Sequence, residues 1–261
     1  MPRAFTRAVS PKLAECELTH LERASIDPQA ADLQHSAYEQ ALADAGCDVI
    51  RLADLPGHPD AVFVEDTALL LGDHAVITRP GVASRASEAE STAAGLAAHF
   101  ELHRMESGYL DGGDVLRIGD TIYVGRSSRT DASGISELRR IVSPLGCRVV
   151  EAELRDFLHL KSGTTFAGPD AAGTPVLLFS QRSVDAAQFA GVEPMAVDEH
   201  EAPAANCLRV GDHLIVPAGN PRTAEALRRR GFDVFEIDVS ELQKAEAGVT
   251  CMSLIDERAR D

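Results

Sequence analysis

The chain has 261 residues, of which 44% are hydrophobic and 25% charged, and these proportions are typical of a folded globular protein rather than a disordered one. Its formal net charge of −16 disfavours nucleic acid and anionic membranes as partners. No apolar stretch reaches the ~20 residues that a membrane span needs, and the N-terminal "MPRAFTRAVS" lacks the apolar core of a signal peptide. We therefore expect a cytoplasmic protein.

The cysteines and histidines form no familiar ligand motif. The five cysteines, at 16, 47, 147, 207 and 251, are odd in number and lack C-x-x-C spacing, which argues against a disulfide framework or a zinc knuckle and fits a reducing compartment. The only histidines four residues apart are His99 and His103, at the end of a helix-like segment. We interpret them as solvated helix-end histidines without a third ligand, so no metal centre is expected.

The predicted elements follow one another in a regular order. A helix-like segment at 29–45 leads to a strand at 48–52. Three strand–turn–strand segments share a Gly-Asp pair: "LLLGDHAVITR" (69–79), "LRIGDTIYVGR" (116–126) and "LRVGDHLIVPA" (208–218). Helix-like segments follow each of them, at 87–100, at 132–145 and from Pro221 to Gly231, the last with Asn220 as its predicted cap. Apolar strands then come at 147–154 and 232–239.

These elements form an internal repeat. The turn glycines Gly72, Gly119 and Gly211 are separated by 47 and 92 residues, so a further copy is expected near 165, where "FAGPDAAGTPVLLFS" (166–180) is a degenerate version. The unit is strand, strand, helix, strand. We predict an α/β fold in which residues 1–261 form a single domain of five pseudo-symmetric repeats of about 46 residues, the fifth divided between the chain ends. The alternative is an ordinary α/β fold in which Gly-Asp hairpins recur.

Polar residues interrupt the strand that precedes each turn. Glu65 and Asp66 do so in the first copy, Asp111 in the second and His159 in the third. A closed ring would direct all four side chains toward one axis, which is costly unless a cationic ligand or a reaction uses them. Cys251, on the strand that would complete the fifth copy, is then a candidate nucleophile. Taken alone, Cys251 is better interpreted as a buried structural thiol, and only the partners in the other copies favour a nucleophile.

Two arginines also occupy matching positions. Arg85 and Arg129 each follow a serine and shortly precede a helix-like segment. Solvated helix-start arginines are the ordinary interpretation, but two in corresponding positions favour a forked clamp for a carboxylate.

With these residues assembled, the chain resembles the dimethylargininase family of the guanidine-modifying enzymes. The matching motifs run in family order: "FVEDTA" (63–68), "ITRPGVASR" (77–85), "LDGGDVL" (110–116), "SSRTD" (127–131), "LHLKSG" (158–163), "AANC" (204–207) and "TCMS" (250–253). The resemblance implies a five-bladed α/β propeller, the pentein fold, around a polar central channel.

The resemblance also implies the roles of the residues. Cys251 is the nucleophile, His159 the general acid and base, and Asp111 the group that orients His159. Glu65 and Asp66 hold the guanidinium of the substrate. The remaining substrate contacts are implied at Asp60 for the α-ammonium, at Arg85 and Arg129 for the α-carboxylate, and at the backbones of Leu18 and Ala245.

The implied activity is hydrolysis of Nω,Nω-dimethylarginine and Nω-monomethylarginine to citrulline. The implied chemistry needs no metal or organic cofactor. The sequence leaves open whether the protein forms a homodimer. The nearest alternative is an arginine deiminase, although that family carries Glu where this chain has Asp111. An amidinotransferase fits less well, because the chain has no evident insertion for an acceptor site. A non-catalytic arginine-binding protein would not need Cys251, His159 and Asp111 together.

Overall fold

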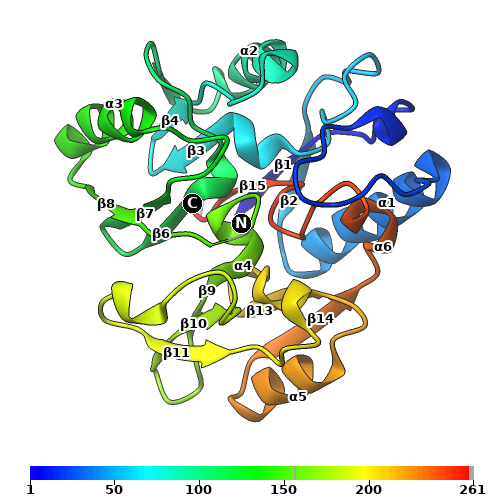
Figure 1. Ribbon diagram of the computed structural model, residues 1–261, viewed down its shortest axis with the longest axis vertical. Coiled ribbons are helices and arrows are strands. Elements are labelled where there is room, and N and C mark those ends of the chain that lie inside the picture. The colour runs from blue at the N-terminus through cyan, green and yellow to red at the C-terminus, as the bar shows by residue number, and fades with distance from the viewer. Residues whose placement is uncertain (156, 259–261) are drawn as a thin grey trace.

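The strands form five separate three-stranded sheets around a central axis in the computed structural model, which describes residues 1–155 and 157–258 (Figure 1). The longer helices lie on the outside of this ring, at the periphery of the view in Figure 1, whereas the short helix at Leu160–Gly163 lies near the centre. In strand order the sheets are β15-β1-β2, β3-β4-β5, β6-β7-β8, β9-β10-β11 and β12-β13-β14.

Where the sequence predicted a segment, the observed element matches it to within about four residues at each end. The strands are β1 Arg3–Thr6, β2 Asp48–Arg51, β3 Ala68–Leu71, β4 His74–Ile77, β5 Glu101–Arg104, β6 Val115–Ile118, β7 Thr121–Gly125, β8 Arg148–Ala152, β9 Thr164–Pro169, β10 Pro175–Phe179, β11 Glu193–Ala196, β12 Leu208–Val210, β13 His213–Pro217, β14 Asp233–Ile237 and β15 Leu254–Asp256. The helices are α1 Pro28–Asp44, α2 Ala86–Leu96, α3 Ala132–Val142, α4 Leu160–Gly163, α5 Pro221–Arg229 and α6 Ser240–Gln243.

The Gly-Asp turns are two-residue hairpins. In the second sheet β3 ends at Leu71 and β4 begins at His74, which leaves only Gly72 and Asp73 between antiparallel strands. Gly72 has φ 58°, and the following residue is not in the left-handed region. A type II′ hairpin has this pattern, because it needs positive φ only at its first central residue, where glycine carries no steric cost.

In every sheet the middle strand pairs antiparallel with one neighbour and parallel with the other. The parallel pairs β4–β5, β7–β8 and β13–β14 are joined through α2, α3 and α5, as a parallel crossover requires. The fourth sheet departs from the predicted unit, since a short 3-10 turn at Ala186–Gln188 stands between β10 and β11 where a helix was expected. Asn220 precedes α5 as predicted, but its side chain donates to the carbonyl of Pro217 instead of capping the helix.

The two ends of the chain complete one sheet. β1 pairs antiparallel with β15 and parallel with β2, so the C-terminal strand takes the place that β3 has in the second sheet. Arg3 on β1 forms an ion pair with Asp256 on β15 at 2.5 Å, and both side chains are buried. The strand assignment of Cys251 was wrong: this residue lies in a turn before β15, because the chain must leave the axis before it can pair with β1.

Apolar side chains pack between neighbouring sheets and under the helices. One cluster joins the two chain ends to the second sheet through Phe5, Leu254, Ile77 and Leu96. Among the described residues, none of the helices combines the length and apolar character that crossing a bilayer requires. The predicted α/β ring of five units is confirmed, whereas the assignment of all 261 residues to one domain stays a prediction.

Removal of the Asp256 carboxylate should destabilise the protein strongly. Asp256→Ala leaves the buried guanidinium of Arg3 without its main anion, which typically costs about 3–5 kcal/mol of unfolding free energy. Urea unfolding measures the loss. The matched control is Glu90→Ala, whose partner Arg104 is largely exposed, so its cost should stay within about 1 kcal/mol. Equal costs for the two variants would contradict the importance of the closing pair.

Candidate active site

The predicted polar residues lie at equivalent places in different sheets. Glu65 and Asp66 form a 3-10 turn just before β3, and Asp111 starts the turn that leads into β6. His159 immediately precedes α4, which runs into β9, and Cys251 precedes β15. Each of these strands is the first of its sheet, and together they surround the axis (Figure 1). The ring therefore gathers side chains that are almost 190 residues apart in the sequence.

His159 lies between two carboxylates. Its Nε2 is 3.1 Å from Asp111 Oδ2, and its Nδ1 is 3.9 Å from Asp66 Oδ1. Burial lowers the pKa of His159, but Asp66, the hydrogen bond to Asp111 and the charge of Asp114 raise it more, to about 9. The buried imidazole of His159 is therefore protonated at neutral pH.

Glu65 and Asp66 both have cationic partners in the folded protein. Glu65 accepts from Lys161 Nζ at 2.6 Å and from the Thr250 hydroxyl at 2.8 Å. Asp66 accepts from Arg85 at 2.6 Å and from the backbone of Gly113 at 3.0 Å. Burial raises the pKa of Glu65. Burial also acts to raise the pKa of Asp66, but the charges of His159 and Arg85 outweigh it and hold this pKa at about 2.

The thiol of Cys251 is buried beside these carboxylates. Its Sγ accepts a hydrogen bond from the backbone of Gly248 at 3.3 Å, and its carbonyl accepts from the backbone of Glu65 at 3.1 Å. Burial, followed by the charges of Glu65 and Asp66, raises the pKa of the Cys251 thiol to about 12. Because both carboxylates disfavour a thiolate, a cation bound between them would favour it.

A loop at 17–21 covers one side of the site. Asp60 accepts from the backbone of Glu17, and Arg129 donates to the Thr19 hydroxyl at 3.0 Å. The carboxylate of Glu246 accepts from the backbone nitrogens of residues 19–21. The loop that carries Leu18 is thus held by two of the predicted substrate-binding residues and by the segment that follows Ala245.

Arg85 and Arg129 are not equivalent, although the sequence places them alike. Arg85 is buried, and its guanidinium donates to Asp66, to Glu88 at 2.9 Å and to the carbonyl of Phe63. Arg129 reaches the covering loop instead. Burial raises the pKa of the Asp60 carboxyl, and the charges of Arg85 and Arg129 offset only part of this rise. Both arginines therefore lie near Asp60, but Arg85 is tied into a carboxylate network.

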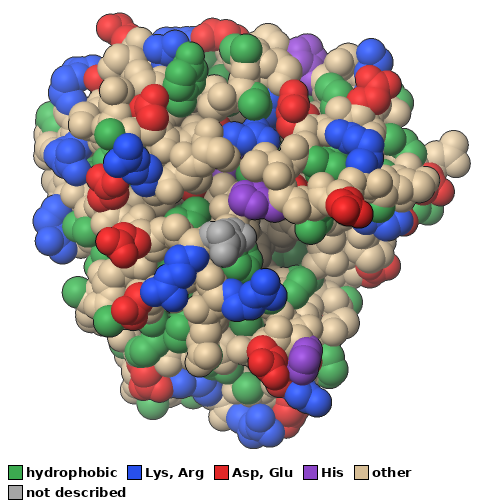
Figure 2. Space-filling view, viewed as in Figure 1, with side chains coloured by type: hydrophobic (Ala, Val, Ile, Leu, Met, Phe, Trp, Pro, Cys, Tyr) green, Lys and Arg blue, Asp and Glu red, His purple; other side chains and the backbone are tan. Residues whose placement is uncertain are grey.

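Leu18 and Ala245 lie on the apolar side of the thiol. Ala245 belongs to the same buried cluster as Cys251, and Leu18 packs against that cluster. A cavity of about 390 Å³ lies beside them, lined by residues that include Leu21, Phe157, Asn206 and Gly248. Figure 2 shows a hollow near the middle of the face in view, where acidic and basic side chains are interspersed.

Several polar residues of the site were not assigned a role from the sequence. Lys161 and Asn206 lie in the motifs "LHLKSG" and "AANC", but only the ring brings Lys161 to Glu65 and Asn206 to Thr250. Glu246 had no sequence signal.

Asp66, Asp111 and His159 also present donor atoms within 4.8 Å of one another, an arrangement that could hold a metal ion.

No family model matches this chain. It is 39% identical over 256 residues to N(G),N(G)-dimethylarginine dimethylaminohydrolase of Streptomyces coelicolor, with 97% of this chain and 96% of the relative covered. It is 36% identical over 224 residues to the enzyme of the same name from Pseudomonas aeruginosa, with 85% of this chain and 86% of the relative covered.

The chain belongs to the dimethylarginine dimethylaminohydrolase family. A solved structure of the Pseudomonas aeruginosa family member, a cysteine-to-serine variant complexed with citrulline, superimposes with a TM-score of 0.90 and 32% identity. The superposition covers 97% of this chain and 98% of that one. The predicted family, its pentein fold and the assignment as a hydrolase are confirmed.

The reactivity of the thiol of this family member should depend on the charge of the reagent. Because burial and the two carboxylates raise the pKa of the Cys251 thiol to about 12, very little of it is ionised at pH 7, and neutral chloroacetamide should alkylate it very slowly. Chloroacetamidine, a planar cation of similar size, should react much faster because it offsets the charges of Glu65 and Asp66. Mass spectrometry of the modified peptide measures both rates. In Glu65→Gln the rate of alkylation by chloroacetamidine relative to chloroacetamide should fall. Equal rates for the two reagents in the wild type would contradict this electrostatic account.

Proposed function

We propose that this chain hydrolyses Nω,Nω-dimethylarginine to citrulline and dimethylamine, and Nω-monomethylarginine to citrulline and methylamine, through a covalent thiouronium intermediate on Cys251. One observation carries the proposal: the buried thiol of Cys251 lies beside Glu65 and Asp66, and the buried imidazole of His159 lies between Asp66 and Asp111, in a chain of this family. The citrulline complex of the Pseudomonas aeruginosa relative supports it.

The guanidinium of the substrate would bind against Glu65 and Asp66. These carboxylates accept charge-assisted hydrogen bonds in a buried site, where a planar cation is recognised with high directionality. Lys161 and Arg85 already satisfy part of each carboxylate, which reduces the electrostatic cost of holding two anions together in the free protein. The substrate cation adds to this network and lowers the pKa of the Cys251 thiol.

The chemistry then follows in two halves. The Cys251 thiol loses its proton to solvent, and the thiolate attacks the central guanidinium carbon to form a C–S bond. The His159 imidazolium donates its proton to the methylated nitrogen, the C–N bond breaks, and dimethylamine leaves. The His159 pKa of about 9 keeps this acid protonated at neutral pH.

The second half regenerates the enzyme. Neutral His159 takes a proton from water, and the resulting hydroxide adds to the thiouronium carbon. The C–S bond then breaks while the hydroxyl proton passes to the departing sulfur, which releases citrulline and restores the Cys251 thiol. Asp111 accepts from one ring nitrogen at 3.1 Å and so fixes the ring plane for both proton transfers. The other nitrogen, near Asp66, faces the side on which the guanidinium binds.

The amino-acid end of the substrate would lie under the covering loop. Arg129 is the main partner for the α-carboxylate and Arg85 a more distant one, and Asp60 accepts from the α-ammonium. The backbones of Leu18 and Ala245 complete this end. Because Asp60 and Arg129 hold the loop in the free protein, substrate binding would exchange these contacts for its own charged groups.

An arginine deiminase is the alternative activity, and it differs only in whether the site admits the N-methyl groups. Purified protein incubated with dimethylarginine, monomethylarginine or arginine distinguishes them by citrulline formation. We expect turnover of both methylated substrates above that of arginine. Turnover of arginine alone would replace the proposed activity with that of a deiminase.

We also propose that the whole chain acts as one catalytic domain in the cytoplasm. All five cysteines, which lie within the described ranges, are free and buried, as a reducing compartment favours. The final β15 is needed to complete the sheet that precedes the catalytic turn at Glu65 and Asp66.

Cys251→Ser should abolish citrulline formation while the protein remains folded, because an alcohol cannot supply a thiolate. The assay is citrulline release, with the thermal midpoint as the check on folding. Cys147→Ser is the matched control, since this thiol is buried in a different apolar cluster from Cys251, and the variant should keep most of its activity. Substantial turnover by Cys251→Ser would refute the assignment of the nucleophile.

Arg129→Ala should raise KM while leaving kcat and the thermal midpoint nearly unchanged, because it removes one charged hydrogen bond to a distant carboxylate. The expected loss is on the order of 2 kcal/mol of binding free energy, or roughly 30-fold in KM. Arg85→Ala should behave differently and lower the thermal midpoint, since it leaves Asp66 and Glu88 buried without their shared cation. An unchanged KM in Arg129→Ala would remove it from the substrate site.

A further inference from the structure

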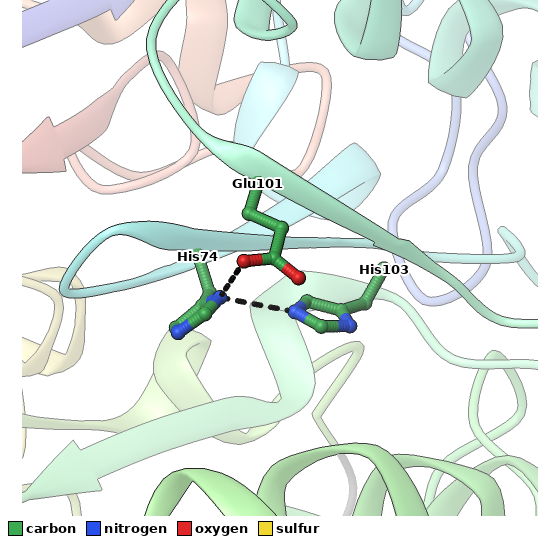
Figure 3. A group of neighbouring side chains, drawn as sticks. All are labelled: His74, Glu101 and His103. Atoms are coloured by element: carbon green, nitrogen blue, oxygen red, sulfur yellow. Dashed lines mark hydrogen bonds and ion pairs between the residues drawn. The ribbon is translucent and has the colours of Figure 1, made fainter.

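A second cluster of ligand-type side chains lies at the edge of the second sheet. His74 is the first residue of β4, and Glu101 and His103 stand two residues apart on β5 (Figure 3). The parallel register pairs His74 with Glu101 and Val76 with His103, so alternation along the strands puts all three side chains on one face. The prediction that His103 is a solvated helix-end residue was wrong, because α2 ends at Leu96 and His103 lies within β5.

The cluster is separate from the catalytic residues. β3 and β4 are antiparallel, with Leu71 opposite His74 at one end and Ala68 opposite Ile77 at the other. Glu65 and Asp66 precede Ala68, so they lie at the far end of the same strand pair. A change at His74 or His103 therefore leaves the proposed chemistry in place.

The donor atoms converge on one point. His103 Nε2 is 3.1 Å from His74 Nδ1, and His74 Nδ1 is 3.5 Å from Glu101 Oε2. The dashed lines of Figure 3 show both rings and the carboxylate turned toward each other. Four ligands at about 2.0–2.1 Å around a tetrahedral Zn²⁺ lie about 3.3 Å apart, and the two observed separations bracket that value.

The ligand types and the exposure also suit a metal ion. Two imidazoles and one carboxylate are a common set for Zn²⁺ and other late first-row divalent ions. The side chain of His74 is 29% exposed and that of Glu101 is 69% exposed, so an ion could enter from solvent and keep water as its fourth ligand. The neighbouring Arg104 does not compete, because it is on the opposite face of the strand and pairs with Glu90 on α2.

The repeat provides an internal comparison. His213 and Asp233 occupy the same register positions in the last sheet, and they form a pair at 2.8 Å. The position equivalent to His103 is Phe235, which stacks on His213 with ring centroids 4.8 Å apart. The second sheet thus differs from its counterpart by a second imidazole in place of an apolar ring, which supplies a third ligand.

We propose that His74, Glu101 and His103 form a surface binding site for one divalent transition-metal ion of the Zn²⁺ type. The ion would bridge β4 and β5 at the outer edge of the sheet and take no part in hydrolysis. Its binding would stabilise the folded protein, since the unfolded chain does not hold the three ligands together.

Equilibrium dialysis against Zn²⁺, followed by metal analysis, tests the site. His103→Ala and His74→Ala should each bind one equivalent less than the wild type at the same free Zn²⁺. Removal of a group that only hydrogen-bonds to a metal ligand typically lowers metal affinity about 10–100-fold. Removal of a ligand itself should therefore lower the affinity for Zn²⁺ at least about 100-fold. Any Zn²⁺ held by the catalytic cluster is common to all these proteins and does not affect the difference.

His213→Ala is the matched control, because it removes an equally exposed histidine with a carboxylate partner but without a second imidazole. It should bind as much Zn²⁺ as the wild type. Zn²⁺ should also raise the thermal midpoint of the wild type more than that of His103→Ala. Equal binding by His103→Ala and the wild type, or an equal loss in His213→Ala, would overturn the proposal.

Discussion

Every charge at the centre of this protein has to be matched, because the ring buries its carboxylates where water cannot solvate them. Asp66 is held by Arg85 of its own unit, whereas Glu65 is held by Lys161 and Asp111 by His159, and both of these partners come from the unit of β9. The pairing lowers the pKa of Asp66 and raises that of His159. The same pairs therefore stabilise the axis and set the protonation states on which the proposed chemistry depends.

This electrostatic balance would keep the thiol protonated until a cation binds beside it. Cys251 is desolvated and lies beside two carboxylates, so the pKa of its thiol is far above neutral pH. A guanidinium that enters the site both removes the repulsion and presents the carbon to be attacked. Recognition and activation of the nucleophile would then be one event, which disfavours reaction with neutral electrophiles.

The repeat explains why the sheets share one arrangement of strands and why the two ends of a sheet can carry different sites. In the three units that have a Gly-Asp turn, the residues before the first strand lie at one end of the strand pair and the residue after the turn lies at the other end. One copy places Glu65 and Asp66 at the first position and His74 at the second. The proposed catalytic residues Glu65 and Asp66 and the proposed metal site thus lie at opposite ends of the same strand pair.

The sequence alone determined the elements and their period, since strand alternation, Gly-Asp turns and helix boundaries depend on neighbouring residues. It also indicated which polar residues face the axis, because they occupy one slot in successive copies, and the motif order indicated the family. It did not reveal the differences between matching positions. Arg85 and Arg129 look alike in sequence, but only one packs against Asp66 and Glu88.

The tertiary structure decided what depends on contacts between distant segments. Three features have no local signal, because each arises where the ring brings separate segments together. They are the contact of Lys161 with Glu65, the hydrogen bonds from the loop at 17–21 to Glu246, and the turn at Cys251. His103 shows the same limit, since its spacing from His99 suggested a helical pair, whereas parallel strand pairing gave it His74 and Glu101 as neighbours.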